Sequence, residues 1–219
     1  MIKLRQKNKW IFHMTHIRNL DSILKAGGLM CDRDIVQSSR RHTNIGYGHI
    51  KKRRMDTVIP CLDPVTIGEC VPFYFCVRSP MLYVIHKHPP ELDYQGGQRE
   101  IIYLAAKIPD VVQNRLTWCF TDSNAAGGFA SFYNELDDLS KLDWKAIEKD
   151  KWADRDNPDS PGLKERKQAE FLVHRFFPWT LITCIVVYDE EILERVKEIL
   201  PDEDNKKNEI YVKKDWYYD

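Results

Sequence analysis

One carboxylate stands where the sequence otherwise predicts a buried strand. In "KERKQAEFLVHRFFPW" (residues 164–179), Glu170 interrupts an apolar run from Ala169 to Val173. Side chains alternate faces along a strand, so the face opposite Glu170 is apolar and should belong to the core. Glu170 itself shares a face with Gln168 and His174.

Two interpretations of Glu170 follow from this pattern. It is either a strand carboxylate on a solvated face, or a carboxylate that projects into a cleft beside a basic loop. The second suits cleavage of a nicotinamide–ribose bond, which passes through an oxocarbenium-like transition state as glycoside hydrolysis does. A carboxylate that holds the ribose 2′-hydroxyl and faces the developing cation lowers that barrier. It can also accept a proton from the incoming nucleophile.

A predicted first strand offers a partner for that carboxylate. In "FHMTH" (12–16), His13 and Thr15 share one face. A histidine at a strand end can hydrogen-bond a ribose hydroxyl, and a purely structural histidine is the alternative. His13 with His16 has no carboxylate or cysteine at ligand spacing, so the sequence does not favour a metal site.

Two further segments carry groups suited to nucleic acid. "HIKKRR" (49–54) lies in the most basic stretch of the chain. It is either an ordinary solvated charge run, a phosphate contact, or a source of an arginine that stabilises a deprotonated base. "RSPMLY" (78–83) brings together an arginine, a methionine and an aromatic that could stack on an unpaired base. A short core-facing helix is the alternative.

The elements that must position these groups form an α+β pattern. Strands and helices mix without strict alternation, which argues against a doubly wound sheet. Strands are predicted at 9–17, 71–77, 100–108, 116–122, 168–174 and 181–188, with an edge strand in 209–218. Helices are predicted at 19–28, 79–87, 124–136 and 189–200, and residues 31–69 and 143–167 are expected to be irregular.

The bulk composition limits the classes of protein. The chain has 219 residues, 43% of them hydrophobic, which suits one domain over 1–219. Lys and Arg number 33 and so do Asp and Glu, so any nucleic-acid site must be a local patch.

No run of 18 apolar residues and no apolar segment after the basic N-terminus is present, so we expect no membrane span, no signal peptide and a cytoplasmic protein. Six cysteines without a CxxC pair predict reduced, mostly buried thiols.

Four segments, in order, resemble the DarT family of DNA ADP-ribosyltransferase toxins of DarT–DarG toxin–antitoxin pairs. They are "FHMTHIRNLDSILKAGGL", "NIGYGHIKKRR", "VPFYFCVRSPMLY" and "QAEFLVHRFFPW", which lie between residues 12 and 179. The resemblance implies the ADP-ribosyltransferase fold, a split mixed β-sheet with peripheral helices and an NAD-binding cleft. It also implies transfer of ADP-ribose from NAD⁺ to thymine or guanine in single-stranded DNA, no metal, and an antitoxin that hydrolyses the ADP-ribosyl bond.

The resemblance also assigns roles around the NAD⁺ cleft. The catalytic glutamate maps to Glu170, and the active-site arginine maps to Arg54, with Arg53 as the second choice. The NAD⁺ ribose and amide side would be held by His13 and Thr15. The residue beside the nicotinamide would be Phe73 or Tyr74.

On the DNA side, the resemblance makes residues 155–168 the substrate-recognition loop. Its basic side chains suit a DNA backbone, and the "RSPMLY" segment would contact bases. The residues concerned are Arg78, Met81, Tyr83, Lys164, Arg166 and Lys167. One departure from the family pattern is "IGECVPFYF", where "HDYVPFYF" is common, and it leaves the entry to that strand and the choice of base open.

The implied mechanism has Glu170 stabilising the oxocarbenium while a base nitrogen attacks the anomeric carbon, with Arg54 easing deprotonation. Glu170→Ala should then abolish modification and leave the fold intact. The alternatives are an RNA, protein or water acceptor, a non-catalytic single-stranded nucleic-acid-binding module, and a metal-dependent nuclease.

Overall fold

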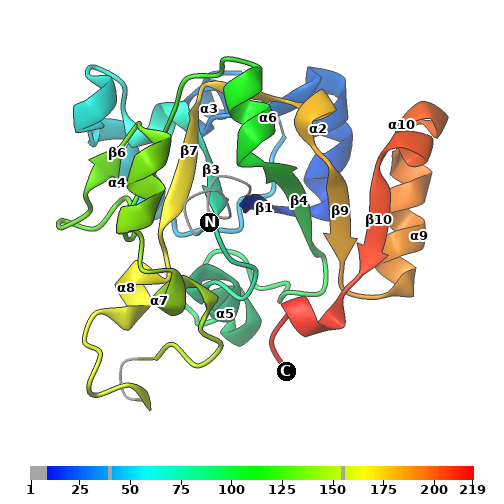
Figure 1. The fold of residues 1–219 in the computed structure, drawn as a ribbon. Helices are drawn as coiled ribbons and strands as arrows, with labels where there is room; N and C mark the ends of the chain where they lie inside the picture. Colours follow the sequence, from blue (N-terminus) through cyan, green and yellow to red (C-terminus); the bar gives the residue numbers. More distant parts are fainter. Residues whose placement is uncertain (1–8, 39–40, 154–155) are drawn as a thin grey trace.

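An eight-stranded sheet in the order β10-β9-β4-β1-β3-β7-β5-β6 runs through the molecule (Figure 1). The computed structural model describes residues 9–38, 41–153 and 156–219. All neighbouring strands are antiparallel except β9 and β10, which are parallel. The sheet is therefore mixed, and with helices around it the predicted α+β class is confirmed.

The seven predicted strands are present, and three further strands, β2, β6 and β8, were not predicted. Those of the large sheet are β1 Trp10–His16, β3 Cys70–Tyr74, β4 Ile101–Lys107, β5 Trp118–Thr121, β6 Phe132–Tyr133, β7 Glu170–His174, β9 Cys184–Val187 and β10 Glu209–Val212. A separate two-stranded sheet pairs β2 Gly28–Met30 with β8 Phe176–Pro178. As predicted, β10 is an edge strand.

The helices surround this sheet. They are α2 Leu20–Ala26, α3 Asp32–Gln37, α4 Gly48–Asp56, α5 Pro80–Lys87, α6 Ile108–Gln113, α7 Trp144–Glu148, α8 Leu163–Arg166, α9 Glu190–Ile199 and α10 Asp202–Lys207. Three helix ends have clear local causes. Gly27 closes α2 in the left-handed conformation, Ser79 caps α5 through Leu82 N–H, and Asp189 caps α9 through Ile192 N–H.

Three expectations are wrong. Residues 124–136 form a turn and β6 rather than a helix, because the Asn124 side chain accepts a hydrogen bond from Ala126 N–H and Gly127-Gly128 follows. Residues 31–69 are not irregular throughout, since they contain α3 and α4. Residues 143–167 likewise contain α7 and α8.

The sheet is nearly divided between β1 and β3. Only Phe12 and Tyr74 are in register across that boundary, whereas β1 pairs with β4 along its whole length. Just before β3, residues 67–69 form a 3₁₀ turn closed by a capping box between Thr66 and Glu69. The division leaves side chains of β1 and β3 facing a shared gap.

Apolar clusters bury both faces of the sheet. Along β4, Ile102 and Leu104 pack on the side of α2, α6 and α9, while Ile101 and Tyr103 pack on the side of α5. A third cluster lies under residues 59–70 and contains Leu172. Both faces of β7 are therefore buried.

The six cysteines are unpaired, and all but Cys61 are buried, as the sequence predicted. Among the described residues, no helix is both long and apolar enough to cross a membrane.

Candidate active site

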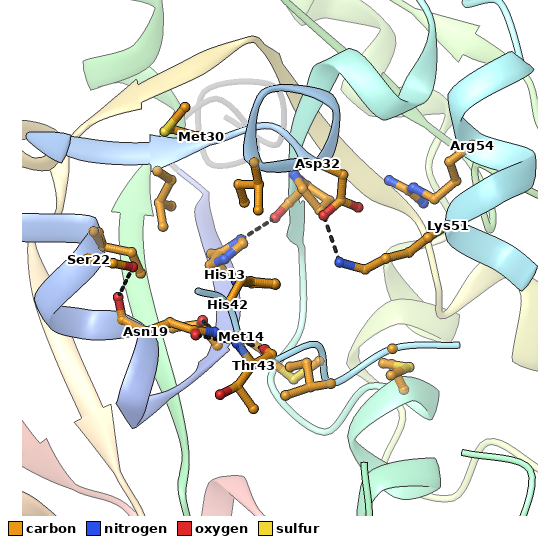
Figure 2. A pocket seen from close by; sticks show the side chains of 18 of the residues that line it. His13, Met14, Asn19, Ser22, Met30, Asp32, His42, Thr43, Lys51 and Arg54 are labelled. Atoms are coloured by element: carbon orange, nitrogen blue, oxygen red, sulfur yellow. Dashed lines mark hydrogen bonds and ion pairs between the residues drawn. The ribbon is translucent and has the colours of Figure 1, made fainter. Parts of the chain in front are cut away.

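A pocket opens where the sheet divides (Figure 2). Its walls come from β1 and β3 of the sheet, from α2, α3 and α4, and from residues 41–47. The lining side chains used below are His13, Thr15, Asn19, Asp32, Lys51, Arg54, Tyr74, Met81 and Glu170. Segments far apart in the sequence thus place imidazole, hydroxyl, carboxylate and guanidinium groups around one cavity.

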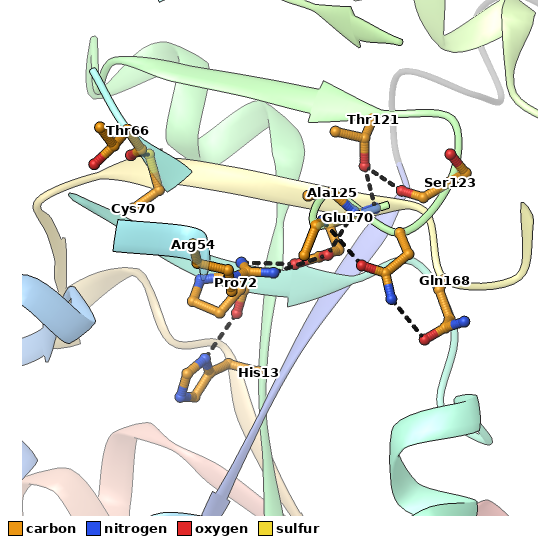
Figure 3. A network of polar contacts seen from close by, with 12 residues as sticks. His13, Arg54, Thr66, Cys70, Pro72, Thr121, Ser123, Ala125, Gln168 and Glu170 are labelled. Atoms are coloured by element: carbon orange, nitrogen blue, oxygen red, sulfur yellow. Dashed lines mark hydrogen bonds and ion pairs between the residues drawn. The ribbon is translucent and has the colours of Figure 1, made fainter. Parts of the chain in front are cut away.

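Glu170 lies at one end of this pocket, at the start of β7 and in register with Tyr74. It is only 3% exposed. Arg54 donates from Nη1 to Oε1 at 3.1 Å and from Nη2 to Oε2 at 2.9 Å, and Ala125 N–H donates to Oε1 at 3.0 Å (Figure 3). The solvated-face interpretation is therefore wrong, because both oxygens are buried and hydrogen-bonded.

The two arginines of "HIKKRR" point in different directions because they are neighbours on α4. Arg54 faces Glu170, and Arg53 donates from Nη1 to the Ala126 carbonyl at 3.1 Å. Burial alone would lower the pKa of Arg54, but the attraction of Glu170 and its hydrogen bonds outweigh burial and raise that pKa. A bidentate, buried pair of this kind holds the carboxylate in one orientation. The geometry favours Arg54 over Arg53 as the site arginine.

A loop after β5 fixes Glu170 from the other side. Thr121 Oγ1 accepts from Glu170 N–H at 3.1 Å and donates to the Ser123 carbonyl at 2.6 Å. Asn124 Nδ2 donates to Gln168 Oε1 at 3.1 Å. Sequence reasoning missed Thr121, Asn124 and Ala125. Their signal was the "TDSN" turn pattern after a predicted strand, which shows a loop without showing what the loop contacts.

His13 and Thr15 both line the pocket, as their shared strand face predicts. His13 Nδ1 lies 2.8 Å from the Pro72 carbonyl, which can only accept, so Nδ1 carries the proton. Burial lowers the pKa of His13 and favours the neutral ring. Its Nε2 is then a free acceptor, and no described residue hydrogen-bonds to that atom.

Asn19 is another site residue that the sequence did not identify. It is buried, and its Nδ2 donates to Thr15 Oγ1 at 3.1 Å and to the Thr43 carbonyl at 3.0 Å. Its Oδ1 accepts from Thr43 N–H at 2.8 Å. Asn19 therefore ties the 41–47 segment, which forms one wall, to the strand that carries His13. The sequence suggested it only as a helix cap, and its side chain makes no capping bond to α2.

A second ion pair, Lys51–Asp32, also lines the pocket. Lys51 Nζ lies 2.7 Å from Asp32 Oδ1, and both side chains are partly exposed (Figure 2). This pair joins α4 to α3 across the cavity wall. Neither residue was predicted to belong to the site.

Tyr74 and Phe73 are separated by strand alternation. Tyr74 lines the pocket, and burial together with the Glu170 charge raises its pKa. Phe73 lies on the opposite face, fully buried, with its ring centroid 4.7 Å from that of Phe177. Phe73 is therefore a core residue, which corrects its assignment to the cofactor site.

The residues predicted to contact DNA do not gather in one place. Met81 lines the pocket. Arg78 lies over the Tyr218 ring at 4.9 Å, and the Tyr83 ring packs edge-on against the same tyrosine at 5.1 Å. Arg78 and Tyr83 thus hold the C-terminal segment against α5.

The basic residues of the 155–168 segment have different environments. Lys164 is exposed, whereas Arg166 is bonded to Asp143 and Ser160. Lys167 is 2% exposed, and its Nζ donates to the Ile147 carbonyl at 2.8 Å, so its assignment to DNA is corrected to a structural one. Arg155, and Arg40 of the basic stretch, lie outside the described residues.

The geometry thus combines a mixed sheet that divides at a pocket with an arginine-paired carboxylate on a strand that lines the same pocket. No group of three potential metal ligands occurs in the described ranges. The model of the DarT family, described as "ssDNA thymidine ADP-ribosyltransferase", matches residues 12–218. The chain belongs to the DarT family, as the four sequence segments predicted.

Relatives in several bacteria cover nearly the whole chain. A DNA ADP-ribosyl transferase of Thermus sp. (strain 2.9) is 41% identical over 209 residues, which are 95% of each chain. A DNA ADP-ribosyl transferase of Mycobacterium tuberculosis is 32% identical over 201 residues, covering 90% of this chain and 84% of that protein.

Solved structures support the same family. The Thermus sp. 2.9 DarT in complex with ADP-ribosylated ssDNA superposes with a TM-score of 0.86 and 39% identity, covering 96% of this chain and 97% of that one. The same protein with NAD⁺ gives a TM-score of 0.81, 37% identity and coverage of 97% and 98%. The predicted ADP-ribosyltransferase fold is therefore confirmed.

Proposed function

We propose that this chain, acting as one domain over residues 1–219, transfers ADP-ribose from NAD⁺ to thymine in single-stranded DNA. The observation that carries the proposal is the buried Arg54–Glu170 pair at the end of the pocket. Membership of a family described by thymidine modification supports the choice of base. The ADP-ribosylated ssDNA and the NAD⁺ held by the Thermus relative support the two substrates.

The pocket wall carries polar and aromatic groups that can contact NAD⁺. The free Nε2 of neutral His13 accepts a hydrogen bond, as a ribose hydroxyl would offer. Thr15 supplies a hydroxyl on the same strand face. The Tyr74 ring, next to Glu170 in the sheet, offers a flat apolar surface for the nicotinamide. We assign these three residues to NAD⁺ binding.

Glu170 performs the electrostatic part of the reaction. Its carboxylate holds the ribose 2′-hydroxyl and faces the positive charge that develops at the anomeric carbon. The bond from that carbon to the nicotinamide nitrogen breaks, and its electron pair leaves with neutral nicotinamide. The nitrogen lone pair of the base then forms the new bond from the opposite side.

Arg54 is coupled to the same step through its hydrogen bonds. Both of its terminal nitrogens donate to Glu170. Oε2 accepts only one of these bonds and can accept a second, so a ribose hydroxyl can donate to Glu170 while the pair is kept. The positive charge of Arg54 beside Glu170 can then stabilise the thymine anion as its ring nitrogen loses a proton to Glu170 or to water.

The substrate should be single-stranded, because Watson–Crick pairing occupies the ring nitrogen of thymine inside a duplex. The chain as a whole is neutral, so DNA must be attracted by local groups.

A partner follows from a more distant relative. A Thermosipho africanus protein that is 24% identical over 192 residues, 87% of this chain and 45% of that protein, is a DNA ADP-ribosyl transferase-DNA ADP-ribosyl glycohydrolase fusion protein. We infer that this chain acts as a toxin beside a separate antitoxin that hydrolyses the ADP-ribosyl bond.

The test is to incubate the chain with labelled NAD⁺ and four oligonucleotides in turn. Each oligonucleotide offers a single kind of base: thymine, guanine, adenine or cytosine. Mass spectrometry should find ADP-ribose on the thymine oligonucleotide alone, with chelator present or absent. RNA and a protein lysate serve as competing acceptors. DNA binding without release of nicotinamide would contradict the proposal and favour the non-catalytic binding module.

A further inference from the structure

The loop between β5 and β6 carries an aromatic side chain that nothing covers. Phe129 is 100% exposed, and no other large hydrophobic side chain of the described residues reaches that exposure. It follows Gly127-Gly128 at the tip of the turn. Burying a phenylalanine is favourable by about 1.5–3 kcal/mol, so a ligand that covers the Phe129 ring can gain free energy of that order.

This loop is anchored at the catalytic carboxylate. Its base is closed by Asp122 N–H to the Ser131 carbonyl at 3.3 Å and by Ser131 N–H to Asp122 Oδ1 at 3.0 Å. Within the loop, Ala125 N–H donates to Glu170 (Figure 3). Phe129 lies four positions after Ala125, a span of at most about 14 Å. That is the length of about four stacked nucleotides.

A basic helix face adjoins the loop. On α4, His49, Lys52 and Arg53 are all exposed, and their spacing of three and four residues puts them on one side of the helix. Arg53 links this side to the loop through the Ala126 carbonyl. No ion pair joins Lys52 to any residue in the described part of the chain. The opposite side of the same helix presents Arg54 to Glu170.

The geometry points to a subsite for a nucleotide that flanks the modified thymine, an inference that rests on the proposed function. Lys52 and Arg53 hold the flanking phosphate, and the Phe129 ring stacks on the adjacent base. Phosphate contacts position a strand without reading its sequence, and base–aromatic stacking tolerates every base. The occupant is single-stranded DNA, because a lone ring among glycines and cations suits a charged strand better than the apolar surface of a protein.

This subsite would explain how a neutral chain engages DNA beside its reacting centre. It would also lie on a different segment from the 155–168 loop, where Lys167 is buried and Arg166 is engaged within its own loop. Phe129 would be a positioning residue, because its ring acts through the placement of the strand and does not touch the reacting atoms.

The test compares steady-state labelling of a thymine oligonucleotide by the wild-type chain, Phe129→Ala and Phe129→Trp. Phe129→Ala should raise KM for the oligonucleotide by about fivefold or more, with kcat at saturating DNA within about twofold, and Phe129→Trp should restore KM. Lys52→Ala should lower the slope of log KM against log salt by about 0.7.

Oligonucleotide length gives a second readout. Shortening the DNA until no nucleotide flanks the thymine should remove the difference between the wild-type chain and Phe129→Ala. The matched control is Tyr211→Ala, which removes a 41% exposed aromatic from β10, at the opposite edge of the sheet, and should leave KM unchanged.

Equal KM values for Phe129→Ala and Tyr211→Ala on the long oligonucleotide would overturn the subsite while leaving the proposed function standing. No labelling of any DNA by the wild-type chain would overturn the proposed function, and the subsite with it.

Discussion

The pocket contains two ion pairs that differ in almost every physical respect. Arg54 and Glu170 are 11% and 4% exposed, share two hydrogen bonds, and have the Ala125 N–H as a third contact. Lys51 and Asp32 are 29% and 20% exposed and share a single 2.7 Å contact. Because the first pair is shielded from water, removing one partner leaves the other as an unpaired buried charge. In the second pair, water can replace a partner that is removed.

The two ion pairs have different roles: one positions the carboxylate of Glu170, and the other holds the wall of the pocket. The buried pair holds the Glu170 carboxylate in one orientation, which the proposed stabilisation of an oxocarbenium requires. The partly exposed pair holds α3 to α4 at the wall, and opening it costs little. We therefore expect substitutions at the first pair to affect both activity and stability, and substitutions at the second to affect neither strongly.

The largest effect should come from Glu170→Ala. Labelling of DNA should fall by at least about 10²–10³-fold, because the group that stabilises the oxocarbenium is removed. The variant should also lose about 3–5 kcal/mol of unfolding free energy, since Arg54 remains buried and unpaired. Chemical denaturation and the labelling assay measure the two effects.

A double variant separates the two effects. Glu170→Gln combined with Arg54→Met removes both charges and should recover most of the lost stability while labelling stays absent. A stable Glu170→Ala single variant would contradict the buried-pair argument. Active enzyme in either variant would contradict the catalytic role.

Asn19→Ala should have the next largest effect. It removes three hydrogen bonds that join β1, α2 and the 41–47 wall, so the unfolding free energy should fall by about 1–3 kcal/mol. KM for NAD⁺ should rise more than kcat falls, because the wall is displaced and the carboxylate is not. The matched control is Asn114→Ala on an exposed turn, which should change neither value.

Lowering the pH should destabilise the folded chain through His13, which lines the pocket. The pKa of His13 is lowered in the folded chain by burial, so the unfolded chain binds the proton first. The stability that neutral His13 contributes is complete above about pH 6.5 and is lost as the pH falls below it. Thermal unfolding between pH 7.5 and 5 should show a smaller drop for His13→Gln than for wild type. An equal drop in both would show that His13 does not contribute.

Lys51→Met should have the smallest effect of this series. A partly exposed ion pair contributes about 0–1 kcal/mol and is screened by salt. The difference in melting temperature between variant and wild type should therefore shrink as salt increases. A loss as large as that of Glu170→Ala would erase the distinction between the two pairs.

Much of this site could be predicted from residue types and spacing. Alternation along the strand put Glu170 opposite the core face of Phe171, and the "FHMTH" pattern put His13 and Thr15 together. These are local properties, since a strand or helix repeats every two or 3.6 residues wherever it lies. The different directions of Arg53 and Arg54 were not predicted, because the sequence did not predict the helix that carries them.

Other features depended on contacts between distant segments. The sequence could not tell which arginine faces the strand, because α4 and β7 are more than 100 residues apart. It assigned Lys167 to DNA, although packing against α7 buries it. It read 124–136 as a helix, although the turn there is selected by its hydrogen bonds to Glu170 and Gln168.

The residues alone therefore determined the inventory of the site: one acid in an apolar strand, a histidine and a hydroxyl on another, and an arginine nearby in a basic run. Only the tertiary structure decided which of these groups meet and how strongly they are held. The physical reason is that a carboxylate acquires its hydrogen-bond partners and its dielectric surroundings from segments that come together only when the chain folds.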